Sequence, residues 1–167
     1  MVPECKSEVI AEFTVDRAIV WESEHGSALY AEGYYGQPVG IRKPKSPEFD
    51  KPLELSLLEC AYLLGKDRIC VHDPIQDRML TANDVIELGF EQDTEFKDRL
   101  LVYSQLRERG YIIRPGLKFG TDFAVYEEGP GIDHAPFLVH VIPQKRGVAP
   151  LDIVRAGRLA TSVRKKF

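Results

Sequence analysis

Three residues near the carboxyl end of the chain have side chains suited to proton transfer and charge stabilisation. Tyr126 ends a segment of alternating apolar residues, His134 follows a glycine-rich stretch, and Lys165 lies in a basic run. Histidine titrates near neutral pH and can donate a proton, and a permanent cation stabilises negative charge that grows in a transition state. Taken alone, each residue is equally consistent with an ordinary structural or surface role.

The other histidines are weaker candidates. His140 lies six residues after His134, in the apolar segment FLVHVI, where a structural role is favoured. His25 and His72 have no comparable context.

Helix signals are clearest in the middle of the chain. Ser56 and Glu59 have the spacing of a capping box, and Gly65 is a natural stop. A second helix is predicted to start after Thr81, and TEFKDRLLVYSQLRERG, residues 94–110, reads as a third.

The segments on either side of these helices show strand patterns. In the opening third, FTVDRAIVWE and GYYGQPVG predict short strands and turns. After Gly110 the period becomes alternating, and YIIRPG, LKFGTDFAVYEEG and APFLVHVI predict strands before a last helix in LDIVRAGRLATSV. We therefore expect an α+β fold, with a small N-terminal α/β domain over residues 1–106 and a mixed αβ domain over residues 107–167.

Length and composition exclude several classes of protein. The chain has 167 residues, and no apolar run approaches the roughly 20 residues that span a bilayer. The N-terminus lacks the pattern of a secretory signal, so the cytoplasm is the expected location. Three cysteines, Cys5, Cys60 and Cys70, form no CxxC pair, and neither a disulfide framework nor a zinc site is expected.

Charge is unevenly distributed along the chain. A net charge of −4 argues against a protein that coats nucleic acid nonspecifically. From His134 onward, however, seven basic residues face one acidic residue, Asp152, so this end could meet phosphate. Residues 37–52, QPVGIRKPKSPEFDKP, hold four prolines together with Arg42, Lys43 and Lys45, and we expect an irregular exposed loop.

Three motifs occur in a recognisable order: RERGYIIRPGLKFGTDFAVYEEG, HAPFLVHVI and RLATSVRKKF. Together they resemble the catalytic domain of the archaeal tRNA-intron endonucleases. The match is close over about residues 94–167, and GYYG with LSLLECAYLL is similar, more loosely, to the smaller domain of that family.

The resemblance implies a fold, an activity and site residues. It implies a nuclease domain of the tRNA-intron endonuclease type, acting on precursor tRNA at bulge-helix-bulge sites as part of a homotetramer or heteromeric assembly. The implied catalytic residues are Tyr126 as general base, His134 as general acid and Lys165 as the cation on the phosphorane, with no metal and no cofactor. The products implied are a 2′,3′-cyclic phosphate and a 5′-hydroxyl. A phenol of ordinary pKa about 10 needs a cation nearby to favour its phenolate, and we expect Lys165 to supply it.

Further residues follow from the same resemblance. Arg158 matches an arginine that stacks on a base of the RNA bulge, which suits guanidinium chemistry. Residues 127–133, EEGPGID, match a loop that docks into a neighbouring subunit, although a plain surface loop is as consistent with them.

The chain also departs from the family pattern. Members usually continue for a few strands beyond the lysine segment, so we expect that the C-terminus is cut or that another polypeptide supplies these strands. The loop 37–52 exceeds the usual length, and Arg42, Lys43 and Lys45 are expected to bind RNA there, with a solvated surface loop as an equally open alternative.

Two other functions are compatible with the chain. One is a noncatalytic structural or RNA-binding subunit of the same complex. The joint presence of Tyr126, His134 and Lys165 argues against it. The other is a metal-dependent nuclease that uses Asp122 and Asp133 to bind magnesium. The spacing of the carboxylates in the sequence does not support such a site.

Overall fold

The structure is a computed structural model, and it describes residues 5–167. The chain folds as α+β into two compact units, Met1–Leu100 and Leu101–Phe167. No helix between residues 5 and 167 combines the length and the apolar character that a membrane span requires.

The first unit is built on a six-stranded mixed sheet in the order β3-β4-β2-β1-β5-β6. Only β1 and β5 pair in parallel, and the other neighbours are antiparallel. The strands are β1 (Ile10–Phe13), β2 (Arg17–Val20), β3 (Gln37–Pro38), β4 (Leu53–Ser56), β5 (Cys70–Asp73) and β6 (Arg78–Leu80).

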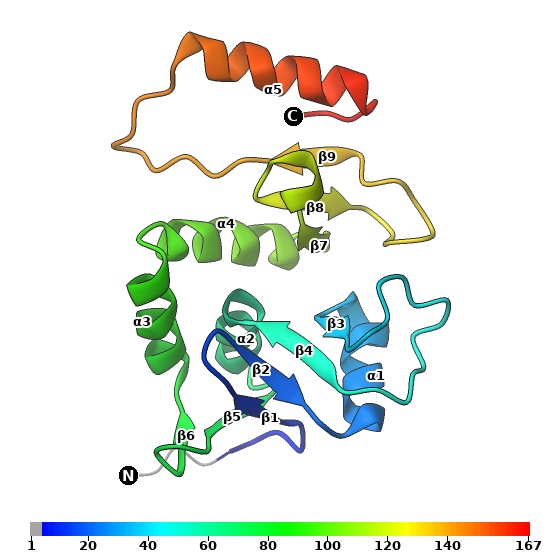
Figure 1. Cartoon of the computed structure of the whole chain (residues 1–167), viewed down its shortest axis with the longest axis vertical. Coiled ribbons are helices and arrows are strands. Elements are labelled where there is room, and N and C mark those ends of the chain that lie inside the picture. Colours follow the sequence, from blue (N-terminus) through cyan, green and yellow to red (C-terminus); the bar gives the residue numbers. More distant parts are fainter. Residues whose placement is uncertain (1–4) are drawn as a thin grey trace. The chain divides into compact units, whose positions relative to one another are not determined.

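Helices pack on this sheet in the first unit (Figure 1). They are α1 (Ser23–Gly33), α2 (Leu57–Gly65) and α3 (Ala82–Gln92). Helix α2 packs against α3 and against β2 and β4, and Leu53, Leu55 and Leu63 are almost wholly buried in the core that results. Burial of such side chains is the main source of stability in a unit of this size.

The predicted capping box of Ser56 and Glu59 and the predicted helix start after Thr81 are both confirmed. Ser56 accepts a hydrogen bond from the Glu59 amide, and the Glu59 carboxylate accepts one from the Ser56 amide. Thr81 and Asp84 form the same reciprocal pair at the start of α3. Helix α2 ends at Gly65, also as predicted.

Glu59 has one further role that its spacing does not reveal. The Gly36 amide donates to Glu59 Oε1 at 2.9 Å, which ties the GYYG turn to the start of α2. Gly36 has a φ of +72°, and a Cβ there would lie 2.5 Å from the Glu54 carbonyl oxygen. Only glycine satisfies both the left-handed backbone and the close approach.

Two expectations for this unit are wrong. Helix α1 lies where strands and turns alone were expected; its sequence SEHGSALYAEG holds two glycines and has a weak apolar stripe, so periodicity does not mark it.

A disulfide joins Cys5 to Cys70, although no disulfide was expected. Folding brings together two cysteines 65 residues apart, because β5, which begins at Cys70, pairs with β1, which follows Cys5 closely in the chain. Cys60 is free and buried, as a core residue.

The second unit holds an antiparallel sheet in the order β7-β8-β9, with α4 on one face and α5 on the other (Figure 1). Helix α4 begins in the first unit and continues into this one. The elements are α4 (Phe96–Glu108), β7 (Ile112–Pro115), a 3-10 turn (Leu117–Phe119), β8 (Phe123–Tyr126), β9 (Phe137–Val139) and α5 (Pro150–Ser162).

The two faces of this sheet have different partners. On the α4 side, the ring of Tyr103 lies 5.9 Å from that of Phe123, and the buried guanidinium of Arg107 donates to the Ile113 carbonyl. On the α5 side, Leu159 and Val163 pack on a cluster of Ala124, Ala135 and Leu138. The predicted strands and the last helix are thus confirmed, and the sheet offers one face on which α5 leads to Lys165.

Candidate active site

Tyr126 is positioned by the register of β8. It pairs with Ile112 of β7, and it shares its face of the sheet with Ala124, two residues earlier. The side chain is half-buried and packs against the cluster of Ala124, Ala135 and Leu138. Packing therefore holds the Tyr126 side chain in place, while part of it stays accessible to solvent.

The electrostatic surroundings of this phenol differ from the expectation. Burial raises the pKa of Tyr126 above its ordinary value, the Arg114 guanidinium lowers it, and the Asp133 carboxylate raises it again. Arg114 of β7 is thus a cation whose charge favours the phenolate, and the role expected of Lys165 stays a prediction. Arg114 carries no sequence signal for this role, because its position depends on strand pairing.

His134 follows a loop that Asp133 holds together. The two carboxylate oxygens of Asp133 accept hydrogen bonds from the Gly129 amide at 2.7 Å and the Glu127 amide at 3.1 Å. Burial alone would raise the pKa of Asp133, but these backbone amides lower it below its ordinary value. The Asp133 side chain therefore stabilises the loop directly before His134.

The side chain of His134 is exposed, and its ring has no hydrogen-bond partner among residues 5–167. An exposed imidazole on a stapled loop is accessible to a substrate oxygen. Because Asp133 is used by its own loop, only Glu127 and Glu128 of the three acidic loop residues remain turned to solvent.

Lys165 is fixed from several directions just beyond α5. Its Nζ donates to the Ala135 carbonyl at 2.5 Å and lies 5.3 Å from the centre of the Phe119 ring. The next residue, Lys166, exchanges backbone hydrogen bonds with Pro136 and Leu138, which attaches this segment to the edge of β9. Phe119, in the KFG motif, is a contact that the sequence did not single out.

Ala135 links the surroundings of the three candidate residues. The Lys165 ammonium touches Ala135, which directly follows His134 in the chain. Ala135 also belongs to the cluster on which Tyr126 and Phe119 pack. The Tyr126 ring and the Lys165 ammonium thus both contact the part of the sheet around Ala135, and His134 precedes Ala135 in the chain.

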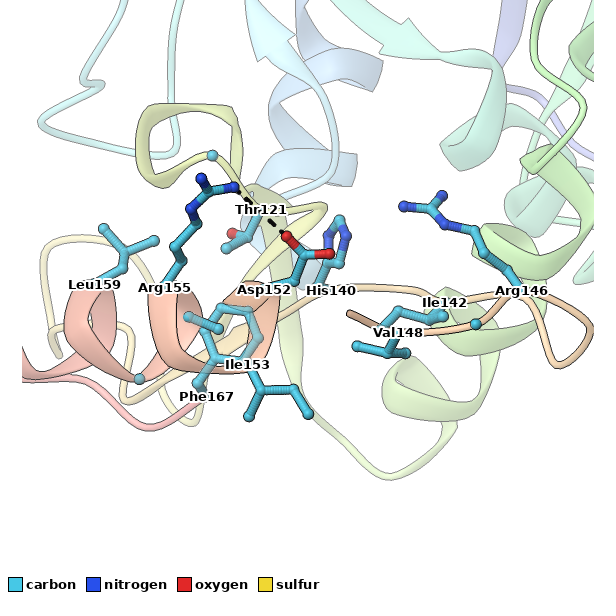
Figure 2. A pocket seen from close by; sticks show the side chains of 14 residues that line it. Thr121, His140, Ile142, Arg146, Val148, Asp152, Ile153, Arg155, Leu159 and Phe167 are labelled. Atoms are coloured by element: carbon cyan, nitrogen blue, oxygen red, sulfur yellow. Dashed lines mark ion pairs between the residues drawn. The ribbon is translucent and has the colours of Figure 1, made fainter. Parts of the chain in front are cut away.

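His140, the competing histidine, belongs to a different feature. It lines a cavity of about 510 Å³ between α5 and the chain after β9, together with Arg146, Arg155 and Thr121, as seen in Figure 2. None of the three candidate catalytic residues lines this cavity.

The imidazole of His140 is held from one side. Its Nδ1 lies 2.9 Å from the Asp122 carboxylate, which also accepts the Val141 amide at 2.7 Å. These contacts fit the structural role that the apolar context of His140 predicted.

Comparison with known proteins shows which family the chain is similar to. A model of the catalytic C-terminal domain of tRNA intron endonuclease matches residues 96–167, and a model of the N-terminal domain matches residues 9–85. A tRNA-splicing endonuclease of Hyperthermus butylicus is 48% identical over 151 residues, covering 90% of this chain and 83% of the relative. The chain belongs to the tRNA intron endonuclease family.

Other members of the tRNA intron endonuclease family show the same relationship. The tRNA-splicing endonuclease of Sulfurisphaera tokodaii is 38% identical over 95% of this chain and 88% of the relative. That of Pyrobaculum islandicum is 41% identical over 89% of this chain and 82% of the relative. Both domains of an archaeal tRNA-splicing endonuclease are thus present, which supports an endonuclease that acts on tRNA introns.

The residues expected to contact RNA lie in both units of this family member. Arg158 is exposed on α5, seven residues before Lys165. Arg42, Lys43 and Lys45 are exposed in the first unit and have no ion-pair or hydrogen-bond partner among residues 5–167.

The two carboxylates considered as metal ligands are engaged elsewhere. Asp122 binds His140 and the Val141 amide, and Asp133 binds amides of its own loop. No group of three or more His, Cys, Asp or Glu side chains suited to a metal ion occurs within the described part of the chain.

Proposed function

We propose that this chain is the catalytic subunit of a metal-independent endoribonuclease that excises introns from precursor tRNA at bulge-helix-bulge sites in the cytoplasm. The observation that supports this most is the contact of the Lys165 ammonium with Ala135, beside His134 and on the cluster that Tyr126 covers. Three groups with complementary proton-transfer and charge roles share one site, and membership of the family supplies the substrate.

The proposed reaction is an attack of a ribose 2′-hydroxyl on its own 3′-phosphate. Tyr126, as phenolate, takes the proton of the 2′-hydroxyl while the 2′-oxygen bonds to phosphorus. The bond from phosphorus to the 5′-oxygen of the next nucleotide breaks, and His134 protonates that oxygen. The products are a 2′,3′-cyclic phosphate and a 5′-hydroxyl, so the reaction consumes no water or cofactor.

Lys165 is proposed to stabilise the phosphorane between these two proton transfers. An ammonium group has three N–H donors, and the Ala135 carbonyl takes one. The remaining donors are free to meet non-bridging phosphate oxygens. Because the ammonium is held in advance, little reorganisation opposes this contact at the transition state.

Arg158 and the loop residues are proposed to bind the RNA rather than to react. Arg158 is an exposed guanidinium on the helix that leads to Lys165, and stacking on an unpaired base would place a bulge beside the site. Arg42, Lys43 and Lys45 would meet phosphates without reading sequence. The assembly is proposed to contain further endonuclease subunits, either identical or different.

The experiment that tests this function uses the purified assembly that contains this chain, with its mass measured. A bulge-helix-bulge RNA is incubated with excess EDTA, and the ends of the products are determined. We expect cleavage at both junctions, 5′ ends that accept phosphate directly from a polynucleotide kinase, and 3′ ends that resist phosphatase until the cyclic phosphate is opened by acid. Loss of activity in EDTA with recovery in magnesium would contradict the mechanism. An assembly that retains activity when Tyr126, His134 and Lys165 are all replaced would indicate a noncatalytic subunit.

A further inference from the structure

The proposed base poses an electrostatic problem. A tyrosine accepts a proton only as phenolate, yet Tyr126 is half-buried, and burial raises its pKa. The negative Asp133 carboxylate, needed to staple the loop before His134, raises this pKa further. Unless a cation opposes both effects, only a minute fraction of molecules holds the base in its reactive form.

The contacts of Lys165 run to groups other than the Tyr126 phenol. Its ammonium is directed to the Ala135 carbonyl and lies over the Phe119 ring. The charged groups that act on the Tyr126 phenol are Arg114, from the neighbouring strand, and Asp133, from the following loop.

The register of β7 and β8 determines where Arg114 lies. Tyr126 is opposite Ile112, and Arg114 is opposite Ala124. Side chains two residues apart share a face, so Arg114 and Tyr126 are diagonal neighbours on the face that carries α5. Diagonal Cβ atoms are separated by roughly 7 Å, which a long guanidinium side chain spans easily.

We propose that Arg114 is a positioning residue of the cleavage reaction, whose guanidinium supports the Tyr126 phenolate while it accepts the 2′-hydroxyl proton. This inference rests on the proposed function of Tyr126 as the general base. It divides the two cationic tasks of the site: Arg114 serves the base, and Lys165 serves the phosphorane. The partly buried setting of Arg114 strengthens the interaction, because solvent screens it less than an exposed pair.

The first test measures the ionisation of Tyr126 directly, without any RNA. The full assembly is prepared with tyrosine labelled by carbon-13 at Cζ, and the signal of Tyr126 is assigned by its loss in Tyr126→Phe. We expect Tyr126 to titrate at higher pH in Arg114→Met than in the wild type, and Arg114→Lys to restore most of the difference. Arg109→Met removes the same charge from an exposed position of the same unit and should leave the titration unchanged.

The second test follows single-turnover cleavage across pH. The reactive form needs an ionised Tyr126 and a protonated histidine, so the alkaline limb of the profile reports the phenol. In Arg114→Met we expect a rate lower by roughly threefold to tenfold near neutral pH, an alkaline limb moved to higher pH, and rates that approach the wild type there. A merely structural role would lower the rate at every pH and leave the limb in place.

The outcomes separate this inference from the function on which it rests. An unchanged titration of Tyr126 in Arg114→Met would overturn the inference, even if cleavage fell. A higher KM with a weaker salt dependence and an unmoved alkaline limb would also overturn it, because Arg114 would then bind phosphate directly. If the titration moved while Arg114→Met cleaved normally, the role of Arg114 in the reaction would be refuted. Normal cleavage by Tyr126→Phe would refute the proposed base itself.

Discussion

The three candidate catalytic side chains differ in exposure in a way that suits their proposed tasks. Tyr126 and Lys165 are half-buried and fixed by packing or by a hydrogen bond, whereas His134 is exposed on its loop. A base and a phosphate-binding cation gain from being held in advance, because their substrate atoms must be aligned for attack. The proposed acid, His134, must protonate the leaving 5′-oxygen, and its exposure leaves the imidazole accessible to that oxygen.

His134 and His140 provide a matched pair for testing the assignment of the general acid. We expect His134→Ala to lower the single-turnover cleavage rate by roughly 100-fold or more, the scale of a lost general acid, with unchanged RNA affinity. His140→Ala should keep a nearly normal rate, because its contacts run to Asp122 and not to the candidate site. Equal effects of the two substitutions, or a near-normal rate in His134→Ala, would refute the assignment. Far-ultraviolet circular dichroism checks that both variants fold.

How much of the site could be predicted from the sequence depends on the range of the interactions. Tyr126, His134 and Lys165 lie in ordered motifs, so the sequence could nominate them, and their joint role stays a prediction. The nearness of Arg114 to Tyr126 on one face of the sheet could not be predicted, because it depends on a cross-strand register that spacing along the chain does not reveal. Lys165 was the plausible cation by charge alone, and its contact with Ala135 depends on how the segment after α5 docks on β9.

At the scale of elements, local signals predicted well and long-range ones did not. The start of α2 followed from the spacing of Ser56 and Glu59, because a capping box is satisfied within four residues. The bond from the Gly36 amide to Glu59 crosses 23 residues, and spacing cannot reveal it. Helix α1 escaped prediction for a related reason: packing on the sheet stabilises it rather than a strong apolar stripe.

The double use of Glu59 has a measurable consequence for stability. Ser56→Ala should lower the free energy of unfolding by about 1 kcal/mol, as the loss of one cap does. Glu59→Ala should cost roughly 1–3 kcal/mol more, because it also removes the hydrogen bond that Glu59 accepts from the buried Gly36 amide. Denaturant unfolding of the two variants gives the comparison. Glu91→Ala, at an exposed position of α3, controls for the loss of a glutamate. Equal losses for Ser56→Ala and Glu59→Ala would show that the Gly36 contact contributes nothing.

At the scale of the whole molecule, long-range closure adds to the stability of the first unit. The disulfide between Cys5 and Cys70 links residues 65 apart, and a loop of that length is expected to lose entropy equivalent to about 4 kcal/mol in the unfolded chain. Counting cysteines gave no hint of this bond. The parallel pairing of β1 with β5 creates the proximity, and the Cys70 amide bonds to the Val9 carbonyl at 2.8 Å.

RNA binding is proposed to involve both units, and in the second unit it depends on Arg158. Arg158→Ala should lose affinity for any bulged RNA but little for plain duplex, because stacking needs an unpaired base. Arg155→Ala removes the same charge from another exposed position of α5 and serves as the control. Binding of both RNAs is measured at one salt concentration. Equal weakening on bulged and duplex RNA would indicate that Arg158 meets phosphate rather than a base.

The proline-rich loop of the first unit is fastened at its base. The Val39 amide bonds to the Pro52 carbonyl at 2.9 Å, and Ser27 exchanges two hydrogen bonds with the Phe49 backbone. The basic side chains between these anchors face solvent. A fastened loop with four prolines loses little entropy on binding, so added cations can contribute to RNA affinity at low cost.

We therefore expect the loop to matter most where other contacts with RNA are missing. The triple variant Arg42→Ala/Lys43→Ala/Lys45→Ala should cleave a standard bulge-helix-bulge RNA at a near-normal rate, and an RNA with one irregular bulge more slowly by roughly tenfold or worse, because fewer phosphates are then neutralised. Its affinity should also depend less on salt, by roughly one unit of the log–log slope for each phosphate that the loop no longer neutralises. The control Lys6→Ala/Lys66→Ala/Lys97→Ala removes the same charge from exposed positions outside the loop. If relative rates on the two bulged substrates matched in the loop triple and in this control, the loop would be a solvated surface segment that does not bind RNA.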